Sequence, residues 1–196
     1  IGVYDTGEEN TVQGNVKWEF KTGHWILSSV IELDSLIYFG STDNNVYGLD
    51  IDTGDEMWRF ESDGQVRSTP AIENGTIYFG SKDDSVYAVI LESGGVKWTF
   101  QTGGNVYTSP LLVNGVVYIG SDDAYLYALD AETGEERWKF QTQDVIRSSA
   151  SSDGEAIYVG SLDNHLYSLD PEMGAMNWKY DMDFDMYTTP AVADGT

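Results

Sequence analysis

The sequence of 196 residues contains no cysteine, only four prolines and only ten basic residues. Without cysteine, the chain can form no disulfide, no thiolate metal site and no thiol nucleophile. It also lacks an apolar run of the ~18 residues that a membrane-spanning helix needs, so we expect no membrane insertion. The shortage of lysine and arginine disfavours nucleic acid as a partner, because phosphate binding needs a basic face.

Acidic residues dominate instead. Aspartate and glutamate number 33, which gives a formal net charge of −23. A surface of this kind stays soluble where salt screens its self-repulsion, which favours a halophilic source; an ordinary acidic extracellular domain is the alternative. The chain begins with Ile1 rather than Met, so we expect a mature form or an excised piece that has lost a signal or an anchor.

An internal repeat of 40 residues organises the chain. A tryptophan and a glycine mark each copy, and a Gly-Ser pair and two tyrosines keep the same step. The tryptophans are Trp18, Trp58, Trp98, Trp138 and Trp178, and the glycines are Gly54, Gly94, Gly134 and Gly174. Several registers in phase without an insertion indicate a repeat architecture rather than chance similarity.

Each copy predicts four short antiparallel strands. In the third copy we expect a first strand at 106–113, a tight hairpin turn at Asn114-Gly115, and further strands at 116–121, 125–130 and 136–142. A four-stranded meander that recurs at this interval is typical of a β-propeller blade. The predicted fold class is therefore an all-β propeller.

The repeat register also predicts the domain boundaries. Four complete blades are expected at 26–61, 66–101, 106–141 and 146–181, within a propeller over 15–196 that follows an irregular lead-in at 1–14. Partial blades remain at both ends, a fourth strand at 15–21 and a first strand at 186–193. We expect a piece of a larger propeller, with a five-bladed ring that shares its last blade as the alternative. The open strand edges also predict self-association.

The segment VYIGSDDAYLYALDAETGEERWKF at 117–140 resembles the PQQ-like, or tryptophan-docking, repeat. That repeat occurs in quinoprotein dehydrogenases, in the bacterial outer-membrane assembly lipoprotein and in archaeal surface proteins. The resemblance implies that the repeated tryptophans and glycines listed above are structural, each tryptophan docking on the turn of the neighbouring blade. Residues 88–94 depart from the pattern, because Ile90 replaces the turn Asp and Ser93 the Thr, so this turn is expected to be looser.

The same resemblance makes a PQQ-binding dehydrogenase the enzymatic alternative. Such an enzyme needs calcium ligands, an Asp base and often an adjacent Cys pair, whereas this chain has no Cys and uniformly short loops. We therefore expect no catalytic residue, no metal and no cofactor, with PQQ and calcium as the alternative. The repeated aspartates Asp43, Asp83, Asp123 and Asp163, and the segment 50–55, are interpreted as turn-capping groups.

One register differs between the copies. The residue before the Ser/Thr pair of each innermost strand is Leu, Arg, Tyr, Arg and Tyr in turn. Innermost strands line a propeller channel, so Arg67, Tyr107, Arg147 and Tyr187, with Trp25 from the first copy, are the predicted rim of a binding mouth. Two guanidinium groups would select a protein partner or a small anionic ligand. In the alternative interpretation, the arginines only pair with nearby acids such as Asp63 and Asp144.

Together these features predict a non-catalytic binding or assembly scaffold outside the cytoplasm, at the cell surface or in a periplasm-like space. A PQQ-binding dehydrogenase-like domain and a sensor module of a larger receptor are the alternatives.

Overall fold

The computed structural model describes residues 15–192, so the expected lead-in at 1–14 and the final residues 193–196 lie outside the described part. Within 15–192 every regular element is a β-strand, and no helix is present that could cross a membrane. The strands form four separate sheets of four, and within each sheet every strand pairs antiparallel with its neighbours in sequence. The predicted all-β propeller architecture is confirmed.

Each sheet is one blade, numbered here in chain order. Blades 1 and 2 contain β1 (Ile31–Leu33), β2 (Leu36–Gly40), β3 (Asn45–Asp50), β4 (Glu56–Glu61), β5 (Ala71–Glu73), β6 (Thr76–Gly80), β7 (Ser85–Ile90) and β8 (Val96–Gln101). Blades 3 and 4 contain β9 (Leu111–Val113), β10 (Val116–Gly120), β11 (Tyr125–Asp130), β12 (Glu136–Gln141), β13 (Ser151–Ser152), β14 (Ile157–Gly160), β15 (His165–Leu169) and β16 (Met176–Asp181).

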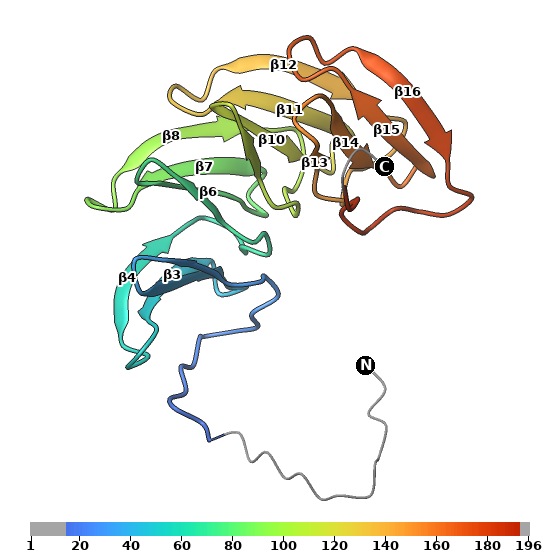
Figure 1. Ribbon diagram of the computed structural model, residues 1–196. Coiled ribbons are helices and arrows are strands. Elements are labelled where there is room, and N and C mark those ends of the chain that lie inside the picture. The colour runs from blue at the N-terminus through green and yellow to red at the C-terminus, as the bar shows by residue number, and fades with distance from the viewer. Residues whose placement is uncertain (1–14, 193–196) are drawn as a thin grey trace, which may run out of the picture.

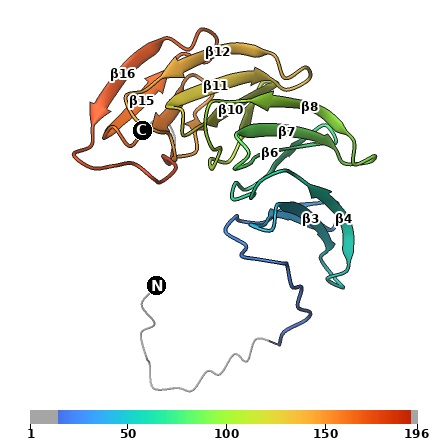
Figure 2. The ribbon, with the colours of Figure 1, turned by 180° about the vertical axis from the view of Figure 1, so that it is seen from behind.

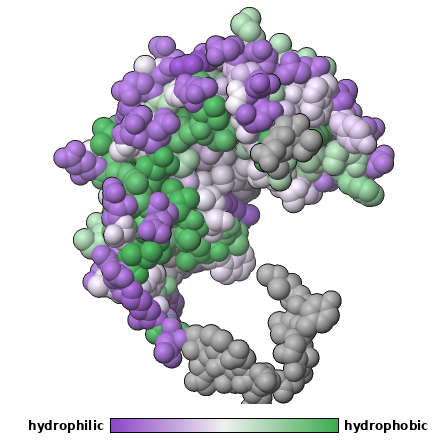
Figure 3. Space-filling model, viewed as in Figure 1, coloured by the Kyte–Doolittle hydropathy of each residue, from purple (hydrophilic) through white to green (hydrophobic). Residues whose placement is uncertain are grey.

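The blades follow one another along an arc, with β4, β8, β12 and β16 on its outside (Figures 1 and 2). Residues 15–25 and 182–192 lie at opposite ends of this arc (Figure 1). These two segments therefore do not build the shared fifth blade of the five-bladed alternative. Hydrophilic residues follow the outer edge of the arc in the space-filling view (Figure 3).

The hairpin turns have the backbone that their sequence predicts. Asn114 and Gly115 both have positive φ, 51° and 72°, as a type I′ turn requires. Asn74 and Gly75 repeat this geometry in blade 2. Because these hairpin turns are tight, we expect the side chains that vary between blades to lie at the channel ends of the blades rather than in long loops.

The innermost strands are shorter than the sequence predicts. The expected strand at 106–113 begins at Leu111, because Pro110 has no N–H to donate and the residues before it bond through side-chain hydroxyls instead. Residues 15–21 and the described part of 186–193 are not strands either. Within residues 15–192, neither segment has a neighbouring strand with which it could form a ladder.

The core lies between consecutive blades rather than inside one. One cluster joins Tyr78 and Val86 of blade 2 to Val117 and Ile119 of blade 3. The glycine that ends each second strand permits this close approach. A Cβ on Gly40, for example, would lie 2.6 Å from a methyl carbon of Val66, on the segment leading into blade 2. Packing of this kind fixes the blades against one another and so positions their channel ends.

Candidate functional site

The Ser/Thr pair of each innermost segment holds the channel side of the propeller together. In blades 1 to 3 the first hydroxyl bonds within its own blade: Ser28 Oγ, for example, donates to Gly40 O at 3.0 Å and accepts from Gly40 N–H at 2.9 Å. In blade 4, Ser148 Oγ donates instead to Thr188 O at 2.8 Å. The second hydroxyl accepts a hydrogen bond from the preceding blade. The amides of Ser29, Thr69 and Ser109 donate to the hydroxyls of Thr69, Ser109 and Ser149, respectively, at 2.8–2.9 Å. We call this inter-blade chain the hydroxyl belt.

The residues immediately before the belt meet at one cavity. Its volume is about 290 Å³, and its lining is Leu27, Arg67, Tyr107, Arg147 and Tyr187. The structure thus brings together four of the five residues predicted for the rim. Trp25 is not among the lining residues; the first copy contributes Leu27 instead, because Leu27 rather than Trp25 occupies the shared register. We call these five lining residues the rim.

Tyr107 lies at the centre of a basic cluster. Its ring centroid is 5.4 Å from Arg67 Cζ, 5.1 Å from Arg147 Cζ and 5.9 Å from Lys82 Nζ. Cations are attracted to the face of an aromatic ring at such distances. Three of the ten basic residues of the chain therefore gather around one side chain, in a protein of net charge −23.

The two rim arginines have different partners. Arg147 makes a bidentate ion pair with Asp122, through Nε at 2.9 Å and Nη2 at 3.0 Å, which raises its pKa above the ordinary value. Arg67 has no ion pair within residues 15–192. Its Nη2 donates to Gln65 Oε1 at 3.1 Å, and its buried Nε has no partner there. The charge of Arg67 is thus the less compensated of the two.

Lys82 was missed by the sequence-based prediction of the rim. It follows the Gly-Ser pair of blade 2, where the other copies have Thr42, Asp122 and Leu162. Its amide donates to Gln65 O at 3.0 Å, which brings this turn beside the innermost segment of the same blade. The variable residue at this second register was the signal that could have identified it.

The repeated aspartates cap their turns, as interpreted from the sequence. Asp43 accepts from the amide of Asn45 at 3.2 Å and from the hydroxyl of Tyr47 at 2.9 Å. Burial raises the pKa of Asp43, but hydrogen bonds from Tyr47, Asn45 and Ser41 outweigh it and hold the pKa below its ordinary value. In blade 2, burial and the same kind of bond to the aspartate raise the pKa of Tyr87 to about 12.

A quinone site of the PQQ type implies a set of calcium ligands. Within residues 15–192, no group of three or more His, Asp or Glu side chains is arranged to hold a metal ion. The segment 50–55 is a capped turn, in which Asp50 Oδ1 accepts from the amides of Asp52 and Thr53.

Three of the repeated tryptophans contact the turn of the following blade. The indole N–H of Trp98 donates to Ala131 O at 3.0 Å, and those of Trp18 and Trp138 make the equivalent bonds to Ile51 O and Pro171 O. The rings lie against the turn glycines Gly54, Gly134 and Gly174, where an added Cβ would come within 2.5–2.6 Å of the indole. A tyrosine hydroxyl, from Tyr78 or Tyr118, donates to the same carbonyl in two of these seams.

The seam between blades 1 and 2 is different, and we call it the loosened seam. Trp58 Nε1 is buried without a partner among the described residues. A Cβ on Gly94 would meet nothing within 4 Å, so the turn does not lie against the indole of Trp58. This is the turn whose sequence departs at Ile90 and Ser93, as expected for a looser contact.

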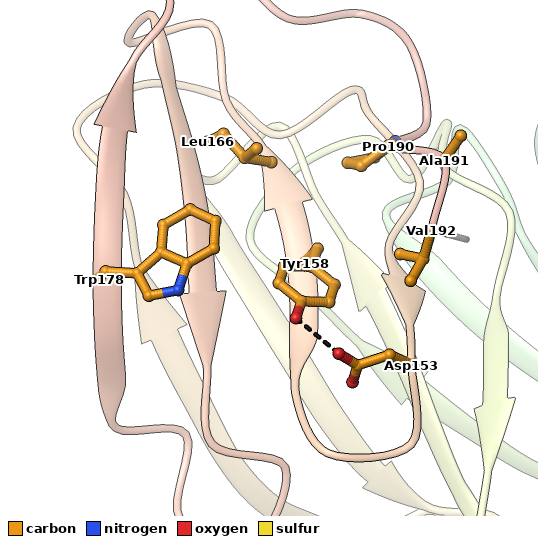
Figure 4. A pocket seen from close by; sticks show the side chains of 7 residues that line it. All are labelled: Asp153, Tyr158, Leu166, Trp178, Pro190, Ala191 and Val192. Carbon is orange, nitrogen blue, oxygen red and sulfur yellow. Dashed lines mark hydrogen bonds between the residues drawn. The ribbon is translucent and has the colours of Figure 1, made fainter. Parts of the chain in front are cut away.

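The far face of blade 4 is open where no following blade is described. A cavity of about 330 Å³ lies between Tyr158, Leu166 and Trp178 of the blade and the segment Pro190–Val192 (Figure 4). Trp178 is 45% exposed, compared with 8% for Trp98. This face has the composition of an inter-blade core without the blade that would cover it.

The comparisons with known proteins place these features in a family. A family model described as outer membrane protein assembly factor BamB matches residues 42–152 and 123–196. The chain belongs to this family of PQQ-repeat β-propellers. Among curated proteins, no match to the sequence was found.

Solved structures show the same fold. BamB from Moraxella catarrhalis is similar with a TM-score of 0.73 and 17% identity, over 85% of this chain and 56% of BamB. The computationally designed Ika8 protein gives 0.76 and 17%, over 84% of this chain and 52% of Ika8. The quinohemoprotein alcohol dehydrogenase ADHIIG from Pseudomonas putida HK5 gives 0.73 and 19%, over 84% and 35%. The chain thus spans about half the length, or less, of these proteins.

An assembly factor and an alcohol dehydrogenase therefore share this propeller architecture. The fold alone does not distinguish a scaffold from an enzyme.

Proposed function

We propose that this PQQ-repeat propeller is a non-catalytic scaffold, acting outside the cytoplasm, that binds the carboxylates of an acidic protein segment or a small anion at the rim. The observation that carries the proposal is the gathering of Arg67, Arg147 and Lys82 around Tyr107, beside the cavity of about 290 Å³. Arg147 is paired with Asp122, but no ion pair of Arg67 or Lys82 is found among the described residues, so these two charges form a local attraction for anions on a very acidic molecule.

Arg67 is the proposed anchor. Its guanidinium has no ion pair among the described residues, so a ligand carboxylate would not have to displace an internal one. Arg147 is already neutralised by Asp122 and would mainly orient the ring of Tyr107. Guanidinium groups bind carboxylates through two parallel N–H bonds, which gives directional selectivity as well as attraction.

Tyr187 and Leu27 complete the mouth with apolar surface. Both are exposed, Tyr187 by 56% and Leu27 by 53%, and both line the cavity. Aromatic and arginine side chains together are typical of the residues that dominate binding energy at protein interfaces. The rim therefore offers both the charge and the contact area that an acidic, partly apolar segment would need.

The test is a titration by isothermal calorimetry with two probes, tetraglutamate as an acidic peptide and succinate as a small dicarboxylate. Arg67→Ala should weaken binding at least about tenfold, the effect of losing one hydrogen bond to a charged group. Arg59→Ala is the matched control, because Arg59 is exposed and pairs with Glu56 on β4, away from the rim. Equal losses in both variants, or no binding of either probe to the wild type, would refute the proposal.

A further inference from the structure

The loosened seam contains a larger cavity than the seam that follows it. The volume is about 620 Å³ between blades 1 and 2, compared with about 240 Å³ at the equivalent place between blades 2 and 3. Its apolar walls are Leu33, Leu36, Tyr38, Ile72, Ile90 and Leu91. Hydrophobic residues gather over the first two blades in the space-filling view (Figure 3). The cavity shares no residue with the rim.

A cation is missing from this seam. In two other seams the lysine before the tryptophan reaches an acid on the turn of the following blade. Lys17 Nζ lies 2.6 Å from Asp52, and Lys97 Nζ lies 2.5 Å from Glu132. In the loosened seam Met57 stands at the position of the lysine, and Glu92 stands at the position of the acid.

The acid is consequently left without its partner. Glu92 lines the cavity together with Asp34 and Glu73, and none of the three carboxylates forms an ion pair within residues 15–192. Tyr38 lines the same cavity, and a tyrosine hydroxyl can accept a hydrogen bond from an ammonium group. The site therefore combines an apolar floor with an uncompensated negative mouth.

We propose that the loosened seam binds a small amphipathic amine. Its ammonium group takes the place of the missing lysine beside Glu92, and its apolar body fills the space between Tyr38, Ile72 and Leu91. The charge complementarity follows from the other seams, where the protein itself supplies the same ammonium group to the same position of the turn. This site is independent of the rim and of the function proposed for it.

The probe is 2-phenylethylammonium, titrated into the full chain by isothermal calorimetry in dilute buffer. Neutral 2-phenylethanol and anionic 3-phenylpropionate carry similar apolar bodies with different head groups. We expect saturable binding of the ammonium, at least about tenfold weaker binding of the alcohol, and no binding of the anion. Absence of saturable binding of the ammonium, or equal affinity for all three compounds, would overturn the proposal.

Met57→Lys tests the position of the charge, because it supplies the seam with its own ammonium group. Binding of 2-phenylethylammonium should fall about tenfold. Asn177→Lys is the matched control: Asn177 occupies the same register of blade 4, so the variant changes net charge equally but far along the arc. If Asn177→Lys weakens binding as much as Met57→Lys does, the amine responds only to overall charge and the site is refuted.

A second pair of variants covers the case in which Met57→Lys does not fold, as judged by circular dichroism. Glu92→Gln removes the proposed partner of the amine and should weaken binding about tenfold. Glu132→Gln makes the same change in a seam where Lys97 is already present, and should leave binding unchanged. Unaltered affinity in Glu92→Gln would contradict the proposal.

Discussion

Trp98→Phe and Trp58→Phe remove the same indole N–H from two seams in which its surroundings differ. Trp98 donates to Ala131 O at 3.0 Å, so its replacement removes a hydrogen bond that contributes about 1 kcal/mol. The carbonyl keeps a second donor, the hydroxyl of Tyr78 at 3.0 Å, so no acceptor is left unsatisfied. The cost in the regular seam should therefore stay near the value of one hydrogen bond.

In the loosened seam, Trp58 Nε1 is buried without a partner, a state that destabilises the folded protein by about 1–3 kcal/mol. Trp58→Phe abolishes that cost. The loss of indole ring area is common to both variants and largely cancels when they are compared. We expect Trp58→Phe to be more stable than Trp98→Phe by about 2–4 kcal/mol, or roughly 4–16 °C in melting temperature for a chain of this size.

The assay is equilibrium unfolding in urea, followed by circular dichroism and by fluorescence to establish whether the transition is two-state. Trp138→Phe serves as a second regular seam and should behave like Trp98→Phe, since its N–H donates to Pro171 O at 2.9 Å beside the hydroxyl of Tyr118. If the free energy of unfolding falls as much in Trp58→Phe as in Trp98→Phe and Trp138→Phe, the prediction is wrong.

Three further predictions concern charge and assembly. The melting temperature should rise between dilute buffer and molar NaCl, because screening relieves the repulsion of a net charge of −23; a flat or falling temperature would exclude this. The 196-residue chain should self-associate through the open face of blade 4, so light scattering should show oligomers, and Trp178→Ser should reduce them; a wild-type monomer at all concentrations would count against it. The hydrogen bond from Arg137 lowers the pKa of Asp130 to about 2, so its stabilising effect should be present above the unfolded-state pKa of about 3.9 and be lost as pH falls through about 2. Arg137→Ala should move the NMR titration midpoint of Asp130 upward, and an unchanged midpoint would show that the guanidinium is not the cause.

The repeat made the blades and the rim register predictable. Arg67 and Tyr107 hold the same place in successive copies, so a regular fold had to bring them to neighbouring points of one mouth. Pairing partners were less predictable. Arg147 pairs with Asp122, which is 25 residues away in sequence, rather than with the nearby Asp144. The reason is that the turn after β10 of blade 3 lies beside the innermost segment of blade 4.

The lengths of the innermost strands could not be deduced from the repeat either. The repeat predicts a first strand over the whole of 106–113, whereas the hydroxyl of Thr108 bonds both backbone groups of Gly120 and replaces part of the ladder. Side-chain competition of this kind depends on the distance between two segments, which the pattern alone does not specify.

The hydroxyl belt has a consequence for how such a protein can change. The blades are joined at the channel by a backbone amide and a small hydroxyl, and neither depends on the side chain that precedes them. The rim residue of any blade can thus be exchanged, as Leu27, Arg67 and Tyr107 already differ, without altering the joint beside it. A duplicated blade inherits a complete joint and an unconstrained contact position, so ligand specificity can diversify one blade at a time while the assembly of the blades stays the same.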